Sequence, residues 1–134
     1  MKRKNLLAIF LVFAAIAAAT IIFLRNQNHS VSYLTKESKP PEDGEKIKLL
    51  VENVEFEAEV VKSPAARARG LGGRTDLCPQ CGMLFIFETD NYHAFWMKDT
   101  LIPLDIIWLD KDWQVVDFTA FAQPQAGRPD EELP

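Results

Sequence analysis

The stretch Gly82–Phe118, GMLFIFETDNYHAFWMKDTLIPLDIIWLDKDWQVVDF, decides the fold because short apolar runs alternate in it with turn residues. Met83–Phe87 is an apolar run rich in Phe and Ile and too short for a helix. Pro103–Leu109 is apolar on both faces, which is typical of a strand covered on both sides. Two more strands are expected at Tyr92–Lys98 and Trp113–Thr119, each after a cluster of turn residues.

The segment before this stretch extends the same pattern. Lys46–Val61 predicts two strands around Glu52–Asn53, and the second strand alternates Glu with apolar residues. Ser63 then precedes Pro64, the combination expected at a helix N-terminus, and Gly70 ends the helix. The sequence therefore predicts a mainly β (α+β) domain, a small antiparallel sheet or partly open barrel with one short helix.

Asp105 is the chemically unusual residue of the predicted sheet. It shares a strand face with Pro103, Ile107 and Leu109. A carboxylate among apolar side chains costs several kcal/mol unless it is paired or hydrogen-bonded. We therefore expect partners for Asp105.

The nearest candidate partners of Asp105 in the sequence are Lys98, Arg74 and Thr100. One interpretation is structural: a buried carboxylate that holds the neighbouring loop and the strand register. The other is functional: a perturbed carboxylate at the floor of a pocket, with the same residues as ligand-binding candidates. The sequence leaves both open.

Cys78 and Cys81 are the only cysteines. Outside the cytoplasm, the default for such a pair is a small disulfide or two inert thiols in a loop. A zinc site could use both cysteines with His93, but a fourth ligand would have to come from another chain. A thioredoxin-like redox pair is less well supported, because a strand rather than a helix follows the cysteines. His93 more often fills a core position than binds a metal.

The N-terminal segment Leu6–Leu24 is almost unbroken apolar sequence. As a helix it would extend about 28 Å, close to the thickness of a bilayer core. Lys2–Lys4 precede it, which favours a cytoplasmic N-terminus. A cleaved signal peptide with its site near Ala17–Ala19 is the alternative, but Ile21–Leu24 continue the apolar run, which favours an uncleaved signal-anchor.

Composition divides the chain into parts with different roles. Fifteen basic residues less the four in the first 25 positions leave 11, against 19 acidic residues. An acidic domain argues against nucleic acid as a partner. We expect a cytoplasmic basic tip (1–5), a transmembrane helix (6–24), a flexible tether (25–45), a β-rich domain (46–122) and a disordered tail (123–134). The domain would then lie outside the cytoplasmic membrane, in the periplasm or at the cell exterior.

Several short sequence motifs together resemble those of the domain of unknown function 192 family. They are SPAARARGL at Ser63–Leu71, Arg74, GMLFIF at Gly82–Phe87, FWMKDTLIPLDIIWLD at Phe95–Asp110, and Val115–Val116. The resemblance implies a small, mainly β domain with one short helix, often exported or tethered to a membrane. It implies no particular activity.

The sequence departs from that family's pattern in three places. Gly72–Gly73 follow Leu71 where a Met is common, so packing near Arg74 should differ. The cysteine pair is not a general family feature. Family members also continue with further strands, one similar to Val-Leu-Glu-Leu, so we expect a C-terminally truncated domain whose sheet lacks its closing strands.

Three functions remain open at the level of sequence. The first is an extracytoplasmic module that binds a small ligand or an envelope protein, with Arg74, Lys98, Thr100 and Asp105 as its polar groups. The second is a hydrolase-like enzyme that uses Asp105 with Lys98 or Arg74. The third is a metal or redox site at Cys78 and Cys81. No cofactor is predicted, and the binding module is the favoured interpretation.

Overall fold

A computed structural model describes residues 8–14, 31–33, 40–51, 54–89, 91, 93–125 and 132–133. Among them are nine strands and one helix, α2 (Pro64–Arg69). The strands are β1 (Ala8–Ala14), β2 (Val31–Tyr33), β3 (Lys46–Val51), β4 (Val54–Val61), β5 (Cys81–Phe87), β6 (Phe95–Trp96), β7 (Leu104–Leu109), β8 (Val115–Ala122) and β9 (Glu132–Leu133). The mainly β prediction with one short helix is confirmed within this described part of the chain.

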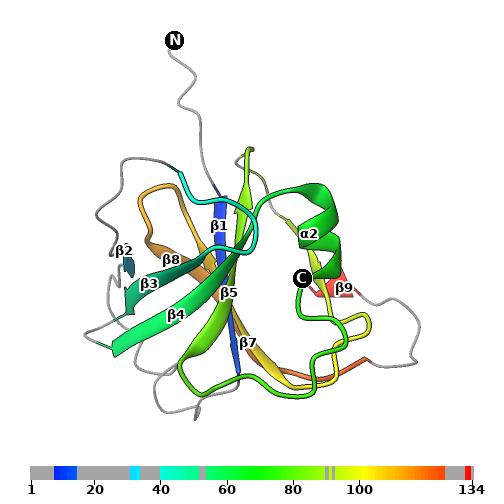
Figure 1. The fold of residues 1–134 in the computed structure, drawn as a ribbon. Helices are drawn as coiled ribbons and strands as arrows, with labels where there is room; N and C mark the ends of the chain where they lie inside the picture. The colour runs from blue at the N-terminus through cyan, green and yellow to red at the C-terminus, as the bar shows by residue number, and fades with distance from the viewer. Residues whose placement is uncertain are drawn as a thin grey trace.

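Seven of the strands form one sheet in the order β2-β3-β4-β5-β1-β7-β8, and β6 pairs with β9 separately (Figure 1). The prediction of an antiparallel sheet is wrong at one point, because β4 and β5 are parallel. The reason is α2, which lies between them in the chain and carries it across so that both strands run the same way. The edge strands β2 and β8 do not pair, so these strands do not form a closed barrel.

Apolar clusters pack on both faces of the sheet, although alternate positions of β3 and several of β4 and β8 remain exposed. All six residues of β7 are buried, as predicted from its apolar sequence. One face joins Ile47 and Leu49 of β3 to Ile107 and Leu109 of β7 in a single core cluster, although β3 and β7 are not neighbours in the sheet. The sheet is therefore curled around that cluster. The other face is covered by α2 and the segment around β6 (Figure 1).

Helix α2 begins and ends where the sequence predicts. The backbone N–H of Ala66 donates to Ser63 Oγ at 3.2 Å, so Ser63 is the N-cap, and Pro64 follows it. Gly70 has a φ of 47°, a left-handed conformation that favours glycine, and its N–H donates to the carbonyl of Ala66. A Cβ at Gly70 would lie only 3.3 Å from the ring of Phe85. Glycine therefore lets this end of the helix lie close to the sheet.

The predicted strand Tyr92–Lys98 is shorter in the structure, where only Phe95–Trp96 pair as β6. The chain then turns: the N–H of Thr100 donates to the carbonyl of Met97 at 3.0 Å, and Asp99 has a φ of 55°. The N–H of Gly73 donates to the carbonyl of Asp99 at 2.8 Å. This turn is therefore tied to the loop after α2, and backbone hydrogen bonds that would extend a strand are used there instead.

Most of the predicted transmembrane helix, Leu6–Leu24, lies outside the described residues. Its portion Ala8–Ala14 is strand β1, antiparallel to both β5 and β7. An apolar sequence without alternation suits a central strand covered on both faces as well as it suits a bilayer. Among the described helices, none is long and apolar enough to cross a membrane. Most of the expected tether (25–45) and the middle of the expected tail (123–134) also lie outside the described residues. Strand β9 lies near the end of that tail.

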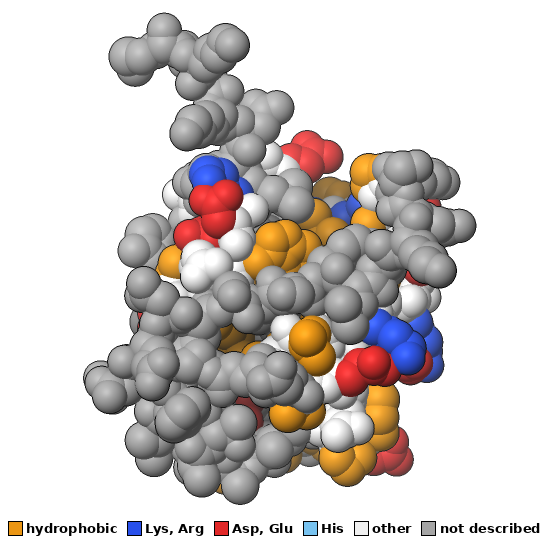
Figure 2. Space-filling view, turned by 90° about the vertical axis from the view of Figure 1, so that its left-hand side faces the viewer, with side chains coloured by type: hydrophobic (Ala, Val, Ile, Leu, Met, Phe, Trp, Pro, Cys, Tyr) orange, Lys and Arg blue, Asp and Glu red, His pale blue; other side chains and the backbone are white. Residues whose placement is uncertain are grey.

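The exposed face of the β3–β4 hairpin carries paired charges. Lys46 contacts Glu57 at 2.7 Å, and Lys48 contacts Glu55 at 2.6 Å. Figure 2 shows acidic and basic side chains next to one another on the face that it views. The alternation predicted for the second strand is confirmed for Ala58 and Val60, which are buried, while Val54 at the start of β4 is exposed.

Candidate functional site

A cavity of about 270 Å³ lies between α2, β5 and the segment that contains β6. Its lining comes from four parts of the chain: residues 67–71 at the end of α2, Phe85 and Phe87 of β5, residues 94–98 with Thr100, and Leu104 and Ile106 of β7. This is the small end of the range of ligand pockets, which hold mostly apolar walls and a few polar groups. The site is thus on the α2 side of the sheet.

The floor of the cavity is apolar and rigid. Leu104, Ile106 and Met97 are buried, with exposed fractions of 4%, 1% and 1%. Leu71 and Phe85 belong to the same core cluster. Because close-packed core residues hold their rotamers, the floor of the cavity is formed before any ligand arrives.

One wall of the cavity is aromatic. The rings of Phe85 and Phe95 meet edge to face with centroids 4.9 Å apart, and those of Phe87 and Phe95 are 6.4 Å apart. Phe95 also meets Trp108 edge to face at 6.1 Å. Trp96, beside them, is 45% exposed. Such a wall favours a flat apolar group, since ring edges and faces pack well against another π-system.

The described lining also includes three cations, Arg67, Arg69 and Lys98. Arg67 is half-buried, donates to the carbonyls of Lys62 and Ile86, and lies with its guanidinium 4.5 Å from the centroid of Phe87. Lys98 lies with its ammonium 5.5 Å from the centroid of Trp96. The described lining contains no Asp or Glu. Positive charge without a lining acid favours a negatively charged ligand group.

The four ligand-binding candidates from the sequence are divided by the structure. Lys98 and Thr100 line the cavity. Arg74 does not line it and forms an ion pair with Glu59 at 2.6 Å. Asp105 is also outside the lining, because it alternates along β7 with Leu104 and Ile106, which face the cavity. The cavity therefore brings together two of the four candidates, Lys98 and Thr100.

Asp105 is 5% exposed, and its Oδ1 accepts a hydrogen bond from the backbone N–H of Phe121 at 2.8 Å. Phe121 has a φ of 55°, and the β7–β8 register shifts between Leu104 and Ile106. The irregular β7–β8 ladder leaves this backbone N–H available to the carboxylate. The hydrogen bond offsets the free-energy cost of burying Asp105. This geometry agrees with the structural interpretation of Asp105.

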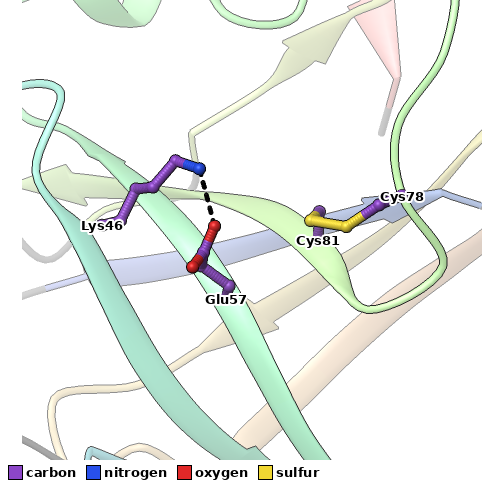
Figure 3. The surroundings of a disulfide bond; sticks show 4 residues. All are labelled: Lys46, Glu57, Cys78 and Cys81. Carbon is purple, nitrogen blue, oxygen red and sulfur yellow. Dashed lines mark hydrogen bonds and ion pairs between the residues drawn. A yellow bond between two sulfur atoms is a disulfide. The ribbon is translucent and has the colours of Figure 1, made fainter.

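Cys78 and Cys81 are joined by a disulfide, one of the alternatives left open by the sequence (Figure 3). The disulfide loop lies beside β4, where the N–H of Glu57 donates to the carbonyl of Gln80 at 2.8 Å. Sulfur atoms bonded to each other are not thiolate ligands, so this state does not hold a zinc site. The rings of His93 and Phe87 are stacked with their centroids 3.8 Å apart. The Nε2 atom of His93 donates to the carbonyl of Thr89 at 3.0 Å.

Sequence reasoning missed most of the cavity. The pattern predicts a short helix that ends at Gly70 and a strand at Tyr92–Lys98, but it does not indicate that side chains of both segments line one cavity. One signal was available: two arginines in the last turn of a helix that carries no acid in its first turn. That signal was weak, because basic residues are common at helix C-termini for electrostatic reasons.

The fold and cavity together define a small mixed-sheet domain with a basic, aromatic-lined pocket on its helical side. A family model described as an uncharacterised ACR, domain of unknown function 192, matches residues 46–133, more than half of the chain. The chain belongs to this family, and its described residues form the expected mainly β domain with one short helix. No curated protein and no solved structure gives a significant match.

Proposed function

We propose that this chain is a binding module whose cavity beside α2 holds a small ligand. One observation carries the proposal: a preformed apolar floor is combined with the polar lining residues Arg67, Arg69, Lys98 and Thr100. Concave sites of this composition are the usual form of small-molecule sites. The volume of about 270 Å³ restricts the bound part to a small group.

The arrangement supports binding rather than hydrolysis. Acid–base catalysis needs a carboxylate or an imidazole within hydrogen-bond reach of the substrate. The described lining includes neither, and Asp105 lies on the opposite face of β7 from the cavity. No observation therefore favours the hydrolase interpretation over binding.

We test the proposal by closing the cavity from its rim. Ala68 and Ala65 are both exposed residues of α2, but only Ala68 lines the cavity. The variant Ala68→Trp should fill the entrance, while Ala65→Trp adds the same side chain elsewhere on the same helix. A panel of small aromatic and aliphatic acids, alcohols and amines is then screened by thermal shift on all three proteins.

We expect at least one class of compound to raise the Tm of the unmodified chain and of Ala65→Trp, but not that of Ala68→Trp. Equal shifts in both variants would place binding outside this cavity and contradict the proposal. The absence of any shift across the whole panel would contradict it as well.

The location of the module is a separate part of the proposal. The apolar segment Leu6–Leu24 and the preceding Lys2–Lys4 support anchoring in the cytoplasmic membrane with the domain outside. In that state Ala8–Ala14 would lie in the bilayer and could not at the same time be β1, so the two placements exclude one another. Alkaline extraction of membranes from expressing cells should leave the full chain in the pellet, and its release into the supernatant would refute the anchor.

A further inference from the structure

We infer that the ligand is an anion with a flat apolar body, and that Arg69 is the residue that recognises its charge. This inference rests on the proposed function, since it assigns the ligand class of the same cavity. It separates the three cations of the lining by what each already contacts within the described residues.

Arg67 is committed to the protein. Its guanidinium donates to the carbonyl oxygens of Lys62 and Ile86 and covers the ring of Phe87. These contacts join α2 to the end of β4 and to β5. Arg67 is therefore a structural part of the wall, and its donors toward a ligand are largely used.

Arg69 differs from Arg67 although both lie in the last turn of α2. Its backbone is fixed, because its carbonyl accepts from the N–H of Gly72 at 3.0 Å. Its side chain is exposed, lines the cavity, and makes no hydrogen bond or ion pair to another described residue. A guanidinium presents a planar set of donors that matches a carboxylate or phosphate in a bidentate way. With respect to the described part of the chain, Arg69 is thus positioned at the rim with its donors available.

Lys98 adds a second charge from the opposite chain segment. It follows β6, and its ammonium lies 5.5 Å from the centroid of the half-exposed Trp96. The formal net charge of the whole chain is −4, yet the lining residues that the structure describes include cations and no acid. The positive potential is therefore local to the cavity, where the apolar floor strengthens it by excluding water.

The ligand body follows from the aromatic wall. Phe87, Phe95 and Trp96 line the cavity together, and the ring of Trp96, which is 45% exposed, offers surface to a further partner. A flat ring system of one or two rings can lie against this wall while its acidic group reaches Arg69. An aromatic carboxylate is the simplest compound of this class.

A purely structural role for Arg69 makes a different prediction. Basic residues in the last turn of a helix offset its dipole and add a few tenths of a kcal/mol of stability. In that case Arg69→Gln lowers the Tm but leaves ligand affinity unchanged. Affinity, measured separately from stability, therefore distinguishes the two roles.

The test uses the full chain and three probes of nearly the same shape: 2-naphthoate, 2-naphthalenemethanol and 2-naphthylmethylammonium. Calorimetric titration of the unmodified chain should give at least tenfold tighter binding of the carboxylate than of the alcohol, with the ammonium weakest. Arg69→Gln should remove most of this tenfold preference. Lys48→Gln makes the same charge change on β3, outside the cavity, and should keep it.

Each of the other outcomes overturns a defined part of the inference. Equal affinities for carboxylate and alcohol, or an unchanged preference in Arg69→Gln, overturn the assignment of an anion and of Arg69 but leave the cavity as a binding site. Binding of none of the three probes overturns this inference, while the wider panel with Ala68→Trp still decides the proposed function.

Discussion

At the scale of single residues, Asp105 shows how an energetic argument from sequence is resolved by structure. The cost of a carboxylate on an apolar strand face required a partner. The structure supplies a backbone N–H from Phe121 rather than placing Asp105 beside the cavity with Lys98 and Thr100. The partner lies 16 residues away, at a point where the β7–β8 ladder is irregular. Asp105 therefore positions strand β8.

Removing this carboxylate should destabilise the fold without affecting ligand binding. In Asp105→Ala the N–H of Phe121 loses its acceptor, and a hydrogen bond to a charged group contributes about 1.5–3 kcal/mol. Asp105→Asn keeps an acceptor oxygen and should lose less. The free energy of unfolding from urea denaturation measures both changes. Loss of affinity for a cavity ligand in a folded Asp105→Asn protein would contradict the assignment.

At the scale of elements, the junction between β4 and α2 is held by one carboxylate. Asp43 Oδ1 accepts from the N–H of Lys62 at 2.5 Å and from the N–H of Ser63 at 3.1 Å. Hydrogen bonding from the Ser63 side chain, and then from the Lys62 backbone, lowers the pKa of Asp43 below its ordinary value of 3.8. The junction directs the chain into the helix that bears Arg67 and Arg69.

This lowered pKa predicts the direction of an acid dependence. A group with a folded-state pKa below its unfolded value stabilises the protein fully above the unfolded value, here 3.8, and less as pH falls through the folded-state pKa. In Asp43→Asn the loss of Tm on acidification should therefore be shallower below pH 3.8 than in the unmodified chain. Glu88→Gln, an exposed carboxyl change elsewhere, is the control. An identical acid profile for Asp43→Asn and the unmodified chain would refute the role.

At the scale of the whole molecule, the notable feature is where the sheet obtains its central strand. β1 lies between β5 and β7, although it precedes the family-matched residues 46–133. Both neighbours are largely apolar and buried, which favours an apolar strand between them. Ala8–Ala14, AIFLVFA, has such a sequence. The same composition is what predicts a membrane helix, so two environments compete for one segment.

A proline within β1 separates these environments. Leu11 pairs with Leu84 of β5 and Ile107 of β7, so Leu11→Pro removes a ladder hydrogen bond from a central strand. In detergent-free solution, Leu11→Pro should lower the free energy of unfolding by about 1–3 kcal/mol, the cost of an unmade buried hydrogen bond. Leu11→Val keeps the N–H and should cost less. If Leu11→Pro unfolds like the unmodified chain, residues 8–14 do not complete the sheet under those conditions.

Sequence by itself determined the local elements of this protein. The limits of α2, the burial of β7 and the hairpin of β3 with β4 follow from capping residues and hydrophobic period, which act over a few neighbouring positions. Asp105 was identified as a residue that needs a partner for the same reason, because its strand face is visible in the alternation of the chain.

Only the tertiary structure decided how these elements meet. The parallel pairing of β4 with β5, the insertion of β1, and the choice of Phe121 as the partner of Asp105 all join residues far apart in the chain. The cavity likewise combines Arg69 of α2 with Lys98 after β6. A surface cation has the same local pattern whether it faces bulk water or a cavity, because that difference depends on which distant segment packs beside it.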